Sequence, residues 1–100
     1  MNLQIPKIKS YIGFAIKSRE ITYGIDDIVK TKKSKLILAS KELGESSLSK
    51  LKGFADSKNI EVILFGSADF AEVVQNENIK AVSIENNNLA EAIKKNLTNF

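Results

Sequence analysis

Residues 35–40 (Lys-Leu-Ile-Leu-Ala-Ser) form an almost unbroken apolar run, and this run constrains the fold more than any other feature of the chain. A strand with one face in water alternates apolar and polar residues, whereas a continuous run is typical of a strand that is covered on both faces. Residues 61–65 (Glu-Val-Ile-Leu-Phe) repeat the pattern and stop at Gly66. We therefore predict that both segments are central strands of a sheet with helices on its two faces.

Amphipathic helices are predicted around these strands. Residues 6–18 place apolar side chains at three- and four-residue steps, and Pro6 suits a first helical turn because its φ is fixed and it has no N–H. A shorter helix is predicted over residues 25–30, and three more are predicted after it. The residues that we expect to cap these last three helices are Ser46 or Ser47, then Ser67, and then Asn88 with Glu91 in a capping box.

Two further strands complete the pattern. Residues 20–23 carry β-forming side chains before Gly24, and residues 79–84 alternate apolar and polar side chains, which favours a strand with one wetter face. Helices and strands then alternate along the whole chain with short connections. This order predicts an α/β fold in a single domain over residues 1–100. Its architecture is a three-layer α/β/α sandwich with a small, mostly parallel or mixed four-stranded sheet.

The composition argues against an enzyme. Of the 100 residues, 43% are hydrophobic and 27% charged, as in one globular domain, and neither cysteine nor histidine is present. The sequence thus offers no disulfide, no thiolate nucleophile, none of the usual zinc ligands and no histidine base. Residues 1–6 lack the layout of a signal peptide, and no apolar run reaches the roughly 18–20 residues that span a bilayer. We expect a cytoplasmic protein with no cofactor, no metal and no membrane contact.

Charge is distributed unevenly along the chain. Residues 1–35 hold eight basic and three acidic side chains, a balance of +5, while residues 36–100 hold seven basic and nine acidic ones, a balance of −2. Such an asymmetry indicates a basic surface that faces a polyanion. A lysine-rich face that only contacts water is the alternative, and charge alone does not separate the two.

Four stretches of the sequence resemble one known family. Residues 12–24 (Ile-Gly-Phe-Ala-Ile-Lys-Ser-Arg-Glu-Ile-Thr-Tyr-Gly), 34–40, 45–51 and 59–63 are similar, in this order and spacing, to segments of the kink-turn-binding ribosomal protein family. The family is typified by proteins of the archaeal and eukaryotic large ribosomal subunit, and the resemblance is strongest to its bacterial ribosomal-protein-like branch. It implies a structured RNA as the partner, ribosomal or regulatory.

The resemblance also implies where RNA would bind. The family carries a Gly-x-Asn-Glu-x-Thr-Lys motif at a strand-to-helix turn; here Gly24 and Lys30 match, while Asp26, Asp27 and Val29 replace the asparagine, glutamate and threonine. A later loop of the family packs apolar atoms on an extruded base, and Phe65 would stack on that base here. The RNA-binding residues expected on this basis are Arg19, Gly24, Asp26, Asp27, Lys30, Lys32, Lys33, Phe65, Gly66 and Ser67.

These residues also have plainer interpretations. Asp26 and Asp27 suit the positive end of a helix dipole, and Phe65 suits a hydrophobic core. We expect a ribosome-associated protein that recognises bent or kink-turn-like RNA by shape and backbone charge. A protein–protein interaction module that kept the fold and lost RNA binding is the main alternative, and an enzyme, or the accessory domain of one, is a third. The sequence leaves the oligomeric state open.

Overall fold

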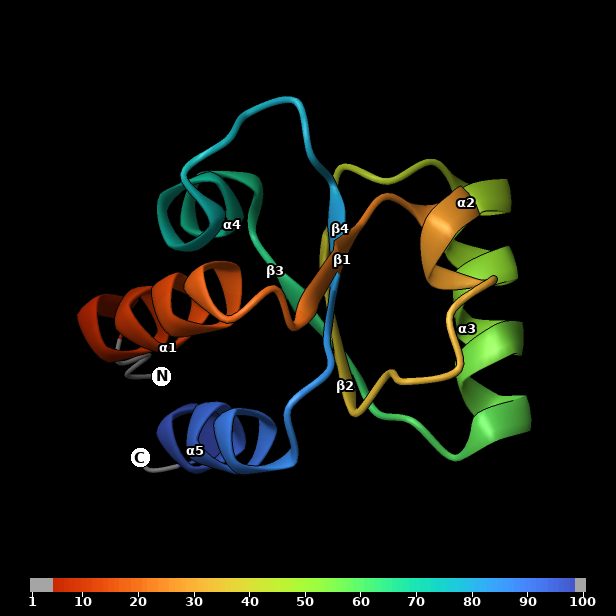
Figure 1. The fold of residues 1–100 in the computed structure, drawn as a ribbon. Coiled ribbons are helices and arrows are strands. Elements are labelled where there is room, and N and C mark those ends of the chain that lie inside the picture. Colours follow the sequence, from red (N-terminus) through yellow and green to blue (C-terminus); the bar gives the residue numbers. More distant parts are fainter. Residues whose placement is uncertain (1–4, 99–100) are drawn as a thin grey trace.

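The protein is a three-layer α/β/α sandwich, as predicted (Figure 1). The computed structural model describes residues 5–98. Three helices cover one face of the sheet and two cover the other. The first group is α1 (Ile5–Lys17), α4 (Ser67–Val74) and α5 (Asn87–Thr98), and the second is α2 (Ile25–Ile28) and α3 (Glu45–Lys58). None of the helices within residues 5–98 has the length and apolar character needed to cross a membrane.

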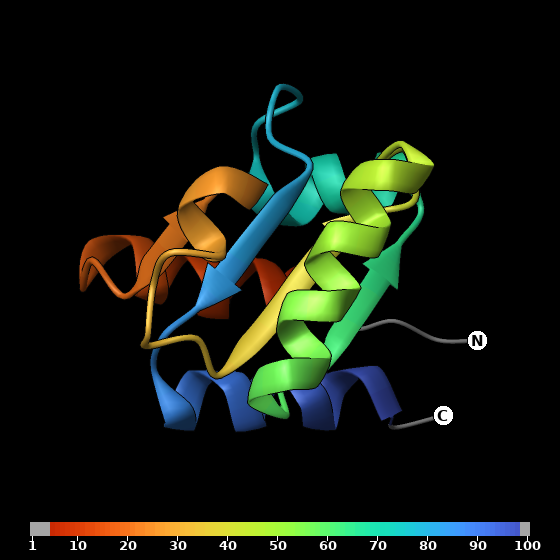
Figure 2. The same ribbon diagram turned by 90° about the vertical axis from the view of Figure 1, so that its right-hand side faces the viewer.

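The sheet is mixed and has the strand order β1-β4-β2-β3. Its strands are β1 (Ile21–Tyr23), β2 (Leu36–Ser40), β3 (Val62–Phe65) and β4 (Ala81–Ile84). The strands β2 and β3 are parallel, whereas β4 runs antiparallel to both of its neighbours, β1 and β2. Figure 2 shows the second face, where α2 lies over β1 and β4 and α3 lies over β2 and β3.

This topology gives the sheet two chemically distinct edges. At one edge β1, β2 and β3 end and β4 begins; we call it the upper edge, after its place in Figure 1. At the other, the lower edge, β1, β2 and β3 begin and β4 ends. The short connections before and after each strand therefore collect at one edge or the other, and these connections carry the candidate functional residues.

The run that forms β2 is buried on both faces, which confirms the prediction. Leu36 and Leu38 pack into the core under α1, α4 and α5, whereas Ile37 and Ala39 pack into the core under α2 and α3. All four side chains are fully buried. Alternate residues of a strand point to opposite faces, so an unbroken apolar run supplies both cores at once.

Two predictions about strand position are wrong. The segment at Val62 to Phe65 is not central: β3 is an edge strand, and three of its four side chains are only half-buried. The central partner of β2 is β4, whose four residues are all buried, so this strand has no wetter face. Its Ser83 has 0% exposure, and its hydroxyl shares a hydrogen bond with the hydroxyl of Ser34. A buried hydroxyl is tolerated in a core when it has a hydrogen-bond partner. The alternation of apolar and polar residues in this strand therefore does not indicate a face exposed to solvent.

The predicted helix caps are also wrong in detail. Helix α3 begins at Glu45 after Gly44 and α4 begins at Ser67 after Gly66, and neither has a side-chain cap. The last helix is capped by Asn86 rather than Asn88, because the Asn86 Oδ1 accepts a hydrogen bond of 2.9 Å from the Leu89 N–H. Three consecutive asparagines (86–88) offer three possible caps, and the tertiary position of Asn86 at the end of β4 selects the first.

Candidate functional site

The Gly24 turn lines a hollow of about 500 Å³ at the upper edge. Gly24 joins β1 to α2 with φ +82°, a left-handed region that favours glycine, and a Cβ there would meet nothing within 4 Å. Both apolar and polar residues line the hollow. Its lining is Tyr23, Gly24, Ile25, Asp26, Leu43, Ser47, Lys50, Asn78, Ile79, Lys80 and Ala81.

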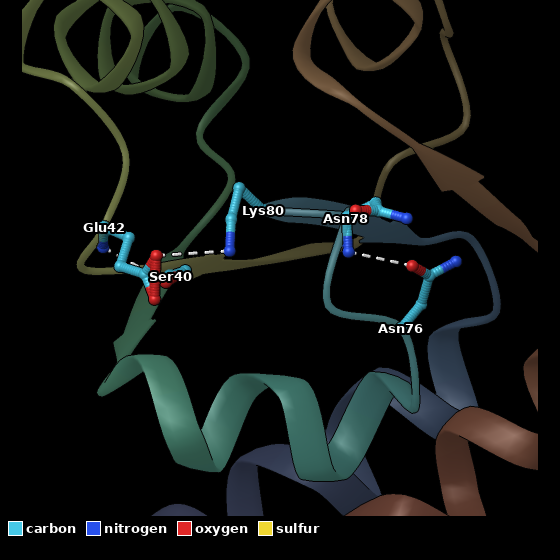
Figure 3. A network of polar contacts seen from close by, with 5 residues as sticks. All are labelled: Ser40, Glu42, Asn76, Asn78 and Lys80. Carbon is cyan, nitrogen blue, oxygen red and sulfur yellow. Dashed lines mark hydrogen bonds and ion pairs between the residues drawn. The ribbon is translucent and has the colours of Figure 1, made fainter.

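The cations around this hollow are paired with carboxylates. The Lys50 Nζ lies 3.4 Å from the Asp26 Oδ1, and the Lys80 Nζ lies 3.2 Å from the Glu42 Oε2. Figure 3 shows the second pair beside Ser40, whose hydroxyl accepts a hydrogen bond of 3.1 Å from the Glu42 N–H. Lys80, and to a smaller extent the Ser67 hydroxyl, hold the pKa of Glu42 below its usual value. Partial burial raises the pKa of Tyr23.

The upper edge as a whole carries more negative than positive charge. Six exposed carboxylates lie in the turns and first helical residues that meet there, against three lysines. The carboxylates belong to Asp26, Asp27, Glu42, Glu45, Asp69 and Glu77, and the lysines are Lys41, Lys50 and Lys80. Because RNA affinity depends mainly on neutralising phosphates, this edge is poorly suited to hold a nucleic-acid backbone.

A second hollow, of about 310 Å³, opens at the lower edge between the α2–β2 connection and the end of α3. We call it the lysine hollow. Three lysines and one half-buried aromatic ring contribute to its wall, and no carboxylate does. The lining residues are Thr31, Lys32, Ser34, Lys35, Phe54, Lys58 and Ile60.

The lysines of this region are unpaired. Lys32, Lys35 and Lys58 are exposed, and none of them has a carboxylate within 4 Å in the described part of the chain. The same holds for Lys30 and Lys33, which are exposed in the same connection. Unpaired ammonium groups around a hollow without acid attract anions, whereas the paired lysines of the upper edge are already neutralised.

The predicted RNA-binding residues do not form one site. Gly24, Asp26 and Asp27 lie at the upper edge with Gly66 and Ser67, which sit beyond β3 on the far side of the sheet. Lys32 and Lys33 belong to the connection that enters β2 at the lower edge, and Arg19 precedes β1 at the same edge. Within residues 1–35 the acidic Asp26 and Asp27 therefore lie at the upper edge, and the basic surface lies away from the Gly24 turn.

The prediction that Phe65 stacks on an RNA base is wrong. Its side chain is only 2% exposed and packs edge-to-face against Phe70, with ring centroids 6.4 Å apart. The strand end faces the core under α1 and α4, so the ring has no access to a ligand.

Comparison with known proteins establishes the fold and nothing further. No family model matches the chain, and no curated protein matches it. A solved structure of a protein with unknown function from Bacillus halodurans is similar to it, with a TM-score of 0.82 and 16% sequence identity over 93% of this chain and 98% of that one. Since one fold supports many functions, function has to be argued from the surface itself.

Only Lys32 of the seven residues that line the lysine hollow was predicted as a site residue, and the other six include Lys35, Phe54 and Lys58. Lys35 precedes a buried strand and Lys58 ends a helix, so each has an ordinary structural explanation in sequence. One feature of the sequence does predict that these two lysines lie close together. Lys35 and Lys58 each come shortly before a predicted strand, and the two strands, β2 and β3, are parallel and begin side by side. The described residues contain no group of three or more acidic side chains that could hold a metal ion.

Proposed function

We propose that the protein binds structured RNA, and that the lysine hollow, together with Lys30 and Lys33, contacts the phosphate backbone. The observation that carries this proposal is the convergence of three unpaired lysines on a hollow whose wall has no carboxylate. Phosphate contacts of this kind give affinity and orientation without reading sequence. RNA is preferred over other polyanions because the sequence resembles ribosomal RNA-binding proteins.

Shape and charge, rather than base identity, govern recognition at this hollow. Lysine presents a flexible point charge and does not impose the fork geometry that arginine uses for bidentate contacts. The α2–β2 connection presents Lys30, Lys32 and Lys33 within four residues, so successive phosphates of one strand are natural partners. A bent or bulged RNA would bring the backbone of both its arms toward this connection.

Salt dependence tests the proposal directly. If the three lysines of the hollow, Lys30 and Lys33 each neutralise one phosphate, log affinity falls with log salt at a slope of roughly −3.5 to −4.5, taking about −0.7 to −0.9 per contact. The probes are a kink-turn RNA, a plain RNA duplex and a single-stranded RNA, each titrated between low and moderate salt. Replacing Lys32 and Lys35 by Gln should flatten the slope by roughly 1.5 to 2 for every probe.

The matched control replaces Lys7 and Lys95 by Gln. Both side chains are exposed on helices of the opposite layer, so the net charge changes equally while the lysine hollow stays intact. An equal effect of the two double variants would show diffuse attraction and refute the assignment to the hollow. No binding to any probe at low salt would refute RNA binding altogether and favour the protein-interaction alternative.

A further inference from the structure

A third hollow, of about 500 Å³, lies at the lower edge between the end of α1 and the start of α5. We call it the Phe14 hollow. Its main apolar feature is the ring of Phe14, whose side chain is 56% exposed although aromatic rings are usually buried. The other lining residues are Lys17, Ser18, Glu20, Asn86, Asn88 and Leu89.

The Glu20 carboxylate is held rigidly in the wall of this hollow. The Asn86 Nδ2 donates to both of its oxygens, at 3.1 and 3.2 Å, while the Asn86 Oδ1 is fixed by the N–H of Leu89. The Ser18 hydroxyl and Asn86 hold the pKa of Glu20 below its usual value, so the group is ionised at neutral pH. A carboxylate accepts several hydrogen bonds, so its two oxygens can accept more than those from Asn86 and Ser18.

The Phe14 hollow and the lysine hollow are neighbours at the lower edge. The Glu85 Oε2 accepts hydrogen bonds from Thr22 at 2.6 Å and from Thr31 at 3.0 Å, which ties the α2–β2 connection to β1. The Glu85 N–H in turn donates to the carbonyl of Glu20 at 2.8 Å. Thr31 lines one hollow and Glu20 the other, so a few hydrogen-bonded residues separate them.

Two unpaired cations flank the Phe14 hollow. Lys17 and Arg19 are exposed, and neither has a carboxylate within 4 Å among residues 5–98. Arg19 also adopts φ 59°, a left-handed position after a helix where glycine is usually preferred. This position carries a charged side chain, although glycine would adopt the same φ without strain.

We propose that the Phe14 hollow receives one unpaired guanine of the bound RNA, which stacks on Phe14 and donates to Glu20 from its Watson–Crick edge. The inference rests on the proposed RNA binding. An aromatic ring next to cations is the usual platform for an unpaired base. Only guanine has two adjacent donors on that edge, N1–H and N2–H₂, and these match the two oxygens of a fixed carboxylate. Lys17 and Arg19 contact the flanking phosphates.

The test uses three RNA duplexes that differ at one position: a bulged guanosine, a bulged uridine, or no bulge. The wild-type protein should bind the bulged-guanosine duplex roughly 5- to 150-fold more tightly than the unbulged one, the range expected for stacking of one base on an aromatic ring. Phe14→Leu should remove this preference and leave binding to the unbulged duplex and its salt slope unchanged. Glu20→Gln should reduce the discrimination of guanosine from uridine, because an amide offers one acceptor.

Matched variants separate the loss of base stacking from a loss of folding or of overall RNA binding. Tyr23→Leu changes an exposed aromatic ring at the upper edge, the only one besides Phe14 among residues 5–98, and should leave the bulge preference intact. Arg19→Gly should keep or raise the free energy of unfolding, since glycine suits φ 59°, while it weakens binding to all three duplexes.

The outcomes distinguish this inference from the proposed function. Equal binding of the three duplexes by the wild type, or a preference that survives Phe14→Leu, would overturn the guanine site while leaving RNA binding in place. Failure to bind any duplex at low salt would overturn both. A wild-type dimer that Phe14→Leu converts to a monomer would assign the hollow to a second copy of the chain and also overturn the inference.

Discussion

Replacing Phe65 by Leu tests whether this ring belongs to the core, as the structure has it, or to a ligand surface, as the sequence suggested. The side chain is 2% exposed and makes an edge-to-face contact with Phe70. Loss of an aromatic pair costs roughly 0.5–1.5 kcal/mol. Imperfect repacking of a leucine in the vacated space adds up to about 1.5 kcal/mol. We therefore expect Phe65→Leu to lower the free energy of unfolding by about 0.5–3 kcal/mol.

The same substitution at Phe14 is the control. Phe14 is 56% exposed, so Phe14→Leu should change the free energy of unfolding by no more than about 0.5 kcal/mol. Urea denaturation followed by far-UV circular dichroism measures both. With a slope of roughly 1–1.5 kcal/mol per molar urea, Phe65→Leu lowers the midpoint by about 0.3–3 M. Equal midpoints for the two variants would refute the burial of Phe65 and would make its ring a candidate ligand contact.

Three further substitutions probe the turns at the two edges. Asn86→Ala removes the cap of α5 and both hydrogen bonds to Glu20, and should lower the free energy of unfolding by about 1–2 kcal/mol, as measured by urea titration. Gly24→Ala should lower it by about 1–2 kcal/mol through backbone strain alone, because a Cβ at φ +82° meets no neighbour; a near-zero change in thermal melting would contradict this. Because the folded-state pKa of Glu20 is depressed, its stabilisation is present above its unfolded pKa of about 4.5 and is lost as the pH falls through the folded value. Glu20→Gln should therefore lose less stability than the wild type between pH 5 and pH 3, which urea midpoints at both pH values would show.

The layers of the fold were predictable because they depend on local patterns. The apolar run of β2 predicts a hydrophobic core on each face of the sheet. Apolar residues at helical spacing predict the helices that pack there, Leu51 and Ala55 in one core and Ile93 and Leu97 in the other. Each of these signals lies within about fifteen residues of sequence. The order of strands was not predictable in this way, because it depends on which strands meet in space. The Val62 to Phe65 segment is as apolar as a central strand. It is nevertheless the outermost strand of the sheet, where α3 and β2 bury only part of it.

The location of the candidate site depends on pairing between distant residues. Lys50 and Lys80 line a hollow, but each meets a carboxylate that lies 24 or 38 residues away in sequence. Lys35 and Lys58 look like ordinary strand-start and helix-end lysines, and they turn out to be unpaired and to share a hollow. Composition counts charges, whereas the tertiary structure decides which of them remain available to a ligand.

The shared direction of β1, β2 and β3 explains why the two edges differ. The helices that follow these strands, α2, α3 and α4, begin at the upper edge. Negative side chains are favoured in the first turn of a helix, and Asp26, Glu45 and Asp69 occupy those positions. Helix α3 ends at the lower edge, where its dipole favours a cation and Lys58 stands. The connections that enter β1 and β2 there supply Arg19, Lys32 and Lys35. The distribution of charge thus follows from the direction of the helices, and a polyanion would be repelled from the edge where the strands end and attracted to the edge where they begin.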